Sequence, residues 1–115
     1  MRKEEHYIQV GIVNYLRLHG IYVFAVPNGG QRAITTAKML KAEGCTAGIS
    51  DLVILEKGTV RFVEVKTSKG RQQESQKEFE EIIKAHNMKY EVWRDIEDAV
   101  DYVKNRKEEG VVNGF

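Results

Sequence analysis

The chain has 115 residues, of which 42% are hydrophobic and 30% are charged, so we expect one small globular domain with a single core. Its one cysteine, Cys45, excludes a disulfide framework, and its three scattered histidines exclude a Cys/His zinc site. A net charge of +1 argues against attraction of a polyanion by the molecule as a whole.

The first half of the chain predicts two helices and one strand. Apolar residues recur at helical spacing from Lys3 to His19. Ile21 to Val26 is a β-branched and aromatic run, and Pro27-Asn28-Gly29-Gly30 ends it as a turn, so we expect a strand there. Ala33 to Glu43 predicts a short helix, and Cys45 to Ser50 a loop.

The middle of the chain predicts a β-hairpin. Asp51 to Leu55 and Val60 to Lys66 are strand-like, and Glu56-Lys57-Gly58-Thr59 has the composition of a turn between them. Both strands are almost continuously apolar, which favours a sheet that is covered on both faces.

The last part predicts a helix, a strand and a helix. The helix spans Arg71 to His86, the strand spans Tyr90 to Trp93, and the final helix is capped by Asp95 and continues to about Lys104. We expect the first of these helices to share one face among Gln72, Gln76, Phe79, Ile82, Ile83 and His86, and the second to pack Ile96, Ala99, Val100 and Val103.

The predicted order is α, β, α, β, β, α, β, α, which indicates an α/β fold with a mixed central sheet flanked by helices. We assign residues 1–115 to one domain, with a core over about residues 4–103. Residues 104–115 form a charged and then apolar C-terminal tail.

The hairpin sets two carboxylates opposite one another. If the chain turns at Lys57-Gly58, Asp51 lies directly across from Glu64 on one face of the sheet. Like charges in that position repel, and a divalent cation held by both would offset the repulsion. Lys66 lies two residues beyond Glu64 and therefore on the same face. Oxygen ligands suit Mg²⁺ or Mn²⁺.

The alternative to a metal site is an ordinary structural role for the same residues. Glu-X-Lys on a strand is often a surface ion pair, and Asp51 could cap a turn. The joint placement of the polar residues, beside Gly44 to Gly48 where backbone can approach a ligand, favours a site.

Two further polar residues, Glu5 and Gln9, lie one turn apart at the head of an apolar ridge on the first helix, and Gln76 heads a similar ridge. We expect Glu5 and Gln9 to face inward. Glu5 could also serve only as a first-turn acid, and Gln76 only as a hydrogen-bonded core amide.

Positive charge is concentrated in the first part of the chain. Residues 1–73 carry a net charge of +5 and residues 74–115 one of −4, and no acidic residue occurs between His6 and Ala42. A local basic face is therefore available for phosphates, although solvated helix charges would give the same pattern. The candidate DNA-contacting residues are Asn28, Arg32, Lys38, Lys41, Lys69 and Arg71.

Taken in order, these residues resemble the virus-type replication-repair nuclease (VRR-NUC) domain, standalone type, a branch of the PD-(D/E)XK nucleases with a restriction-endonuclease-like core. The resemblance extends from about Glu4 to Val103 and rests on Glu5-x-x-x-Gln9, Pro27-Asn28-Gly29-Gly30, Gly48-Ile49-Ser50-Asp51-Leu52, Glu64-Val65-Lys66, Gly70 and Gln76.

The resemblance implies a role for each matching residue. Asp51 and Glu64 would bind Mg²⁺ or Mn²⁺, with the carbonyl of Val65 as a further ligand, and Lys66 would orient or activate the attacking water. Glu5 would be an acid near the metal, at a possible second metal position. Gln76 would match the glutamine of the helix after the motif, with Gln9 in support. The family's Pro-Asp pair is Ser50-Asp51 here, which removes no ligand.

The predicted function is metal-dependent endonucleolytic hydrolysis of DNA. Because standalone domains of this family resemble junction-resolving nucleases that act as dimers, the resemblance further implies a structure-selective enzyme for branched or four-way junction DNA that works as a homodimer. In the dimer, the short basic helix would pack near its mate. Alternatively, that helix covers its own sheet. A catalytically silent nucleic-acid-binding module with the same fold is the main functional alternative, and a protein-interaction domain is another. The chain shows no apolar run near the ~20 residues of a membrane span and no signal peptide, so we expect a cytoplasmic protein without a membrane partner.

Overall fold

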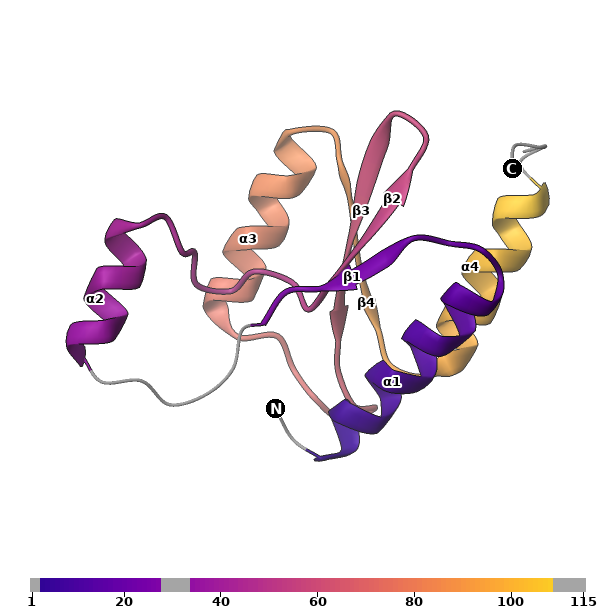
Figure 1. The fold of residues 1–115 in the computed structure, drawn as a ribbon, viewed down its shortest axis with the longest axis horizontal. Coiled ribbons are helices and arrows are strands. Elements are labelled where there is room, and N and C mark those ends of the chain that lie inside the picture. Colours follow the sequence, from indigo (N-terminus) through magenta and orange to yellow (C-terminus); the bar gives the residue numbers. More distant parts are fainter. Residues whose placement is uncertain (1–2, 28–33, 109–115) are drawn as a thin grey trace.

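The structure, a computed structural model, describes residues 3–27 and 34–108 and has the predicted element order (Figure 1). The elements are α1 (Lys3–Leu18), β1 (Val23–Ala25), α2 (Ile34–Ala42), β2 (Leu52–Glu56), β3 (Thr59–Val65), α3 (Glu74–Ala85), β4 (Lys89–Trp93) and α4 (Ile96–Glu108).

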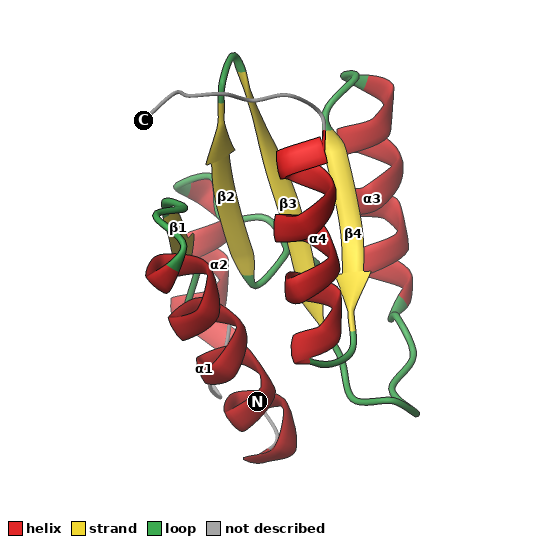
Figure 2. Ribbon diagram, turned by 90° about the vertical axis from the view of Figure 1, so that its right-hand side faces the viewer, coloured by secondary structure: helices red, strands yellow, loops and turns green. Residues whose placement is uncertain are grey.

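The four strands form one mixed sheet in the order β1-β2-β3-β4. The β1/β2 and β2/β3 pairs are antiparallel, and the β3/β4 pair is parallel, as a crossover through α3 requires. Helices α1 and α4 cover one face of the sheet, and α3 lies on the other (Figures 1 and 2). The expected α/β fold is confirmed.

Alternation along the strands divides the apolar residues between two clusters. The larger cluster lies between the sheet and the α1/α4 pair, and the smaller one lies under α3. The first is built on Ile12, Leu16, Leu52, Ile54, Val63 and Trp93, and the second on Phe79, Ile83 and Tyr90 with Phe62 packed against them.

The predicted hairpin register is confirmed. Leu52 pairs with Val63, and the pairing continues to Glu56 and Thr59 at the turn. Gly58 has a φ of 75°, a left-handed conformation that glycine adopts without a steric penalty, so this turn fixes the register of every pair behind it.

Several predicted boundaries are wrong. α3 begins at Glu74 rather than Arg71, because Gln73 occupies the N-cap position. Gln72 therefore lies outside the helix, where its Nε2 donates to Glu80 and to the Tyr90 hydroxyl. Ile82 is 52% exposed and His86 is exposed, so neither belongs to the buried face.

The last helix also differs from the prediction. Asp95 caps it as expected, accepting from the Glu97 N–H at 2.8 Å. The helix continues to Glu108, however, so Lys104 to Glu108 are not part of a tail. Ile96 is 39% exposed, since it packs over the surface of Gly11 instead of entering the core. The predicted apolar tail lies outside the described residues.

Helix α2 stands apart from the sheet and from the other helices (Figure 1). Among the described residues it contacts no other helix or strand. The alternative in which this helix covers its own sheet is therefore wrong. None of the helices in residues 3–27 and 34–108 is long and apolar enough to cross a membrane.

Candidate functional site

The hairpin brings Asp51 and Glu64 together one residue beyond the Leu52–Val63 pair. Asp51 Oδ2 accepts a hydrogen bond from the Val65 N–H at 2.7 Å, which ties the aspartate to β3 beside Glu64. The preceding Ser50 is fully buried, and its hydroxyl donates to the Leu52 carbonyl at 3.2 Å. A buried serine hydroxyl therefore bonds to the backbone at the start of β2.

Glu64 is the electrostatic centre of the site. It is only 3% exposed, and within the described part of the chain its Oε1 is buried without a hydrogen-bond partner. Its Oε2 accepts from Gln76 Nε2 at 2.9 Å and lies 3.9 Å from Lys66 Nζ. Burial and then the charge of Asp51 raise the pKa of Glu64 to about 8, although Lys66 opposes the shift.

Gln76 is held by the first turn of α3 in one amide orientation. Its Oε1 accepts from the Gln73 backbone N–H at 2.7 Å, so its Nε2 must be the atom that points to Glu64. The same contact satisfies one of the free N–H groups at the helix N-terminus. The hydrogen bond that caps α3 therefore also positions Gln76 Nε2 to donate to the buried carboxylate of Glu64. We call Asp51, Glu64, Lys66 and Gln76 the carboxylate cluster.

Gly48 packs directly against the start of α3. With a φ of 78°, its Cα faces the Ser75–Gln76 backbone so closely that a Cβ added there would lie 2.2 Å from the Ser75 carbonyl oxygen. The expectation that the backbone of this glycine loop approaches a ligand stays a prediction, and the structure gives Gly48 a different close contact. Its close approach is to the helix that carries Gln76.

Glu5 of α1 lies close enough to Glu64 for its charge to act on that carboxyl group, and Gln9 lies one turn further along the same helix. Both are half-buried, and the charge of Glu5 contributes to the raised pKa of Glu64. Gln9 Oε1 is buried without a hydrogen-bond partner among the described residues. Glu5 at the start of α1 therefore lies near the hairpin carboxylates, whereas the proposed role of Gln9 stays a prediction.

The predicted DNA-contacting residues fall into three places. Lys38 and Lys41 are exposed on α2, and Lys69 and Arg71 are exposed on the loop between β3 and α3. Asn28 and Arg32 lie outside the described residues. The structure therefore gives two separate basic surfaces, one on α2 and one on the loop between β3 and α3. Both are exposed to solvent.

Arg94 is a residue that sequence reasoning missed. Its Nη1 donates to the Thr67 and Gly70 carbonyls, each at 2.7 Å, and so holds the loop that carries Lys69 and Arg71. An arginine just after a strand gives no local signal, because the carbonyls that it binds are more than twenty residues away.

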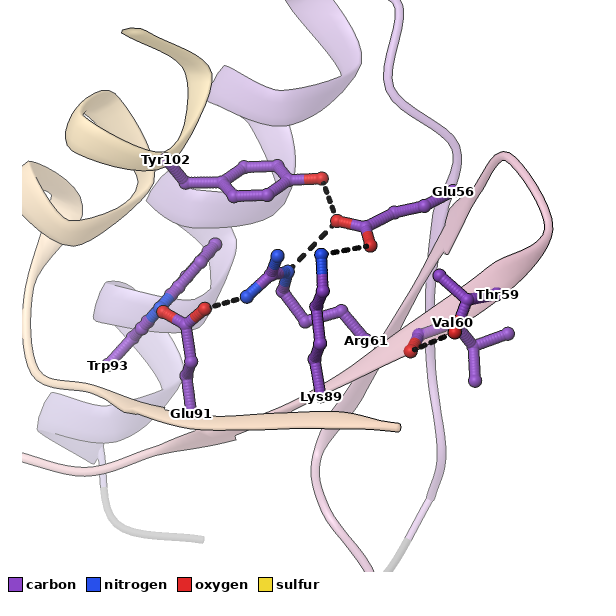
Figure 3. Close-up of polar contacts among 8 residues, drawn as sticks. All are labelled: Glu56, Thr59, Val60, Arg61, Lys89, Glu91, Trp93 and Tyr102. Carbon is purple, nitrogen blue, oxygen red and sulfur yellow. Dashed lines mark hydrogen bonds and ion pairs between the residues drawn. The ribbon is translucent and has the colours of Figure 1, made fainter. Parts of the chain in front are cut away.

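A second polar cluster, also missed, lies near the hairpin turn on the α1/α4 face (Figure 3). Arg61 pairs with Glu56 at 2.9 Å and with Glu91, and its guanidinium lies 4.9 Å from the centre of the Tyr102 ring. Tyr102 donates to Glu56 at 2.6 Å, and these bonds hold the pKa of Glu56 below its usual value despite burial. A cavity of about 720 Å³ borders this cluster. Every charge here has an internal partner, which indicates that the cluster anchors the hairpin to α4.

The carboxylate cluster has the chemistry of a hard-cation site. It supplies oxygen donors from Asp51 and Glu64 and no thiol or imidazole, and one Glu64 oxygen is buried without a hydrogen-bond partner in the part of the chain that the structure describes. No group of three or more His, Cys, Asp or Glu side chains in the described chain could enclose an ion. Such a donor pair fits Mg²⁺ or Mn²⁺, which retain water and accept phosphate oxygens as further ligands.

Comparisons with known proteins agree with this arrangement. Residues 3–95 match the VRR-NUC domain family, a span that includes every member of the carboxylate cluster together with Glu5 and Gln9. No curated protein matches the chain.

Two solved structures share the fold. One, a "VRR_NUC domain protein", has a TM-score of 0.73 and 19% identity, with 99% of this chain and 96% of that chain covered. The other, a "VRR_NUC domain", has a TM-score of 0.66 and 18% identity, with 90% and 97% covered. Because the family match covers most of the chain and the fold agrees, the chain belongs to the VRR-NUC family and is a nuclease-type domain.

Proposed function

We propose that this nuclease-type domain hydrolyses phosphodiester bonds in DNA with Mg²⁺ or Mn²⁺ held by Asp51 and Glu64. The observation that carries the proposal is Glu64 itself. It is buried beside a second carboxylate, one of its oxygens has no hydrogen-bond partner within residues 3–27 and 34–108, and its pKa is raised to about 8. A bound divalent cation would supply the missing positive charge, and when bound it polarises a phosphate and supports the leaving oxygen.

Neighbouring residues fix the orientation of the two carboxylates and supply the other candidate ligands. Gln76 donates to Glu64 Oε2 and fixes the plane of that carboxylate, which leaves Oε1 free to face a ligand. The Val65 N–H holds Asp51 in the same way, and the neighbouring Val65 carbonyl is our candidate for a third oxygen ligand. Glu5 would provide an acid for a second metal position.

Lys66 is our candidate for the group that acts on charge developed in the transition state. It is 8% exposed, and its ammonium lies 3.9 Å from Glu64 Oε2. A fixed ammonium in a poorly solvated position stabilises negative charge on a reacting phosphate more strongly than an exposed one. It would also orient a water next to the carboxylates.

We propose that the substrate is branched DNA, with four-way junctions preferred, and that the enzyme is a homodimer. A two-fold pair would present two carboxylate clusters to the two continuous strands of a junction. Lys38, Lys41, Lys69, Arg71, Asn28 and Arg32 would contact phosphates.

The test is a cleavage panel of single-stranded, nicked, flap and four-way DNA, with Mn²⁺, Mg²⁺ or EDTA. We expect metal-dependent cleavage by the wild type and none by Asp51→Asn or Glu64→Gln. Retained cleavage in either variant would refute the site assignment. DNA binding without cleavage of any substrate would indicate the catalytically silent module instead.

A further inference from the structure

The ends of β3 and β4 bring Lys66 and Arg94 to the same edge of the sheet. The two strands are parallel and Val65 pairs with Trp93, so Lys66 and Arg94 are the next residues on the two strands. The Lys66 N–H donates to the Trp93 carbonyl at 3.0 Å, which extends the pairing beyond the strands. The loop between β3 and α3 and the start of α4 lie at this edge (Figure 2). A contact between Arg94 and that loop is therefore made close to Lys66.

Arg94 closes a tight turn at the start of this loop. The Gly70 N–H donates to the Thr67 carbonyl at 3.1 Å, as in a β-turn. Arg94 Nη1 donates to the carbonyls of both Thr67 and Gly70, each at 2.7 Å, so it links the two ends of the turn. The Arg94 N–H is itself bound to Asp98 Oδ2 at 2.7 Å in the first turn of α4. The turn is therefore fastened to the start of α4.

The same turn covers the side chain of Lys66. A Cβ added at Gly70 would lie 3.4 Å from Lys66 Cδ, so the glycine backbone packs on the aliphatic stem of the lysine. Lys66 is only 8% exposed, whereas Lys69 within the turn is exposed. A lysine side chain that is not held in this way extends its ammonium into water. The position of the Lys66 ammonium, 3.9 Å from Glu64 Oε2, thus depends on the turn staying closed.

We propose that Arg94 is a positioning residue for Lys66. It holds the turn closed over the lysine stem and so keeps the ammonium beside the carboxylate cluster. Without the guanidinium, the Gly70 carbonyl loses this donor, and the turn keeps its single backbone hydrogen bond. Lys66 would then move into water, where its charge acts weakly on a phosphate. The effect on catalysis rests on the proposed function, whereas the effect on the position of Lys66 does not.

The position of Lys66 is tested without DNA or metal. An N-hydroxysuccinimide ester acylates accessible lysine amines, and mass spectrometry gives the rate at each lysine. We expect Arg94→Gln to raise the rate at Lys66 by about tenfold or more relative to the rate at Lys69. Arg94→Lys keeps a donor for the carbonyls and should raise the rate less. The matched control is Arg17→Gln, since Arg17 also donates to a backbone carbonyl, that of Val23 at 3.4 Å, and it should leave Lys66 unchanged.

Circular dichroism and thermal unfolding check that each variant is folded. An unchanged rate at Lys66 in folded Arg94→Gln, or an equal rise in Arg17→Gln, would overturn the proposal. If Arg94→Gln does not fold, the milder Arg94→Lys decides the matter by the same measurement.

The effect on catalysis is tested by cleavage and DNA binding with Mn²⁺. We expect Arg94→Gln to lower the cleavage rate at saturating DNA by about tenfold or more, and Arg94→Lys to restore part of it. The DNA dissociation constant should change by less than about threefold, whereas Lys69→Gln on the same turn should affect mainly binding. An unchanged rate at saturating DNA, or a loss confined to binding, would overturn the effect on catalysis. A wild type that cleaves no DNA, with the expected acylation rates, would leave the positioning of Lys66 standing and remove only the nuclease function.

Discussion

Glu64→Gln should stabilise the metal-free protein at alkaline pH. In the folded chain the pKa of Glu64 rises from 4.5 to about 8, and each unit corresponds to about 1.4 kcal/mol, so ionisation costs at most about 5 kcal/mol. A buried glutamine amide costs about 1–3 kcal/mol when its hydrogen bonds are incomplete. We therefore expect a net gain of about 2–3 kcal/mol at pH 8, or roughly 10 °C in Tm.

The sign of the pH dependence follows from the direction of the shift. A carboxyl group with a raised pKa binds its proton more tightly in the folded state, so its contribution to stability is full below pH 4.5 and is lost as the pH rises to about 8. The advantage of Glu64→Gln should accordingly be absent at pH 4.5 and largest at pH 8 and above. The substitution keeps an oxygen that can accept from Gln76.

The assay is urea or thermal unfolding in EDTA between pH 4.5 and pH 9. The matched control is Glu80→Gln on α3, where the bond to Lys84 at 2.6 Å lowers the pKa of Glu80. That variant should be neutral or slightly less stable at pH 8. If Glu64→Gln is destabilised at pH 8 while folded, or shows no pH dependence, Glu64 does not carry the cost that we assign to it. Added Mn²⁺ should raise the Tm of the wild type and leave Glu64→Gln almost unchanged.

Three further outcomes follow from other contacts. Lys66→Ala should lower turnover far more than DNA affinity. Lys69→Gln should weaken DNA binding and flatten its salt dependence, with little effect on the cleavage rate at saturating DNA. Cleavage assays and binding titrations over a range of salt concentrations measure both. Arg61→Met should lower the free energy of unfolding by about 2 kcal/mol at pH 7, because it leaves the charge of Glu56 without its arginine. The loss should be smaller at pH 3, where Glu56, whose pKa is lowered, becomes protonated. Urea unfolding measures this loss, and an unchanged midpoint would exclude an anchoring role. Gly48→Ala should destabilise the fold by at least about 2 kcal/mol, because its Cβ would meet the Ser75 backbone at a positive φ, and Gly44→Ala, with open space around it, is the control in the same unfolding assay.

The placement of Asp51 opposite Glu64 could be predicted from the sequence, because it depends on the turn residues between the two strands. Gly58 fixes the turn, the turn fixes the register, and the register sets Asp51 opposite Glu64. The element order was also accessible, because hydrophobic periodicity and turn residues are local signals. The roles of these residues in catalysis remain predictions.

Other parts of the site could not be read from the sequence. The bonds from Arg94 to the Thr67 and Gly70 carbonyls join segments that meet only in the folded chain, and so does the pairing of Glu56, Arg61 and Glu91. The start of α3 was misplaced because Gln73 caps it without being one of the usual capping residues. The isolation of α2 has no sequence signal, since its composition suits a packed helix.

The surroundings of Glu64 depend on contacts at the start of α3 as well as on the neighbouring carboxylate. Gly48 admits the start of α3 at van der Waals distance, that position sets the Gln73–Gln76 cap, and the cap points the Gln76 amide at Glu64. One carboxylate oxygen is thereby satisfied and the other is left buried without a partner among the described residues. A carboxylate fixed in this way cannot relax toward water when its charge is uncompensated. If a cation binds as we propose, it would offset the charge of this carboxylate, and the backbone contacts that fix Glu64 would remain when the carboxylates themselves are changed.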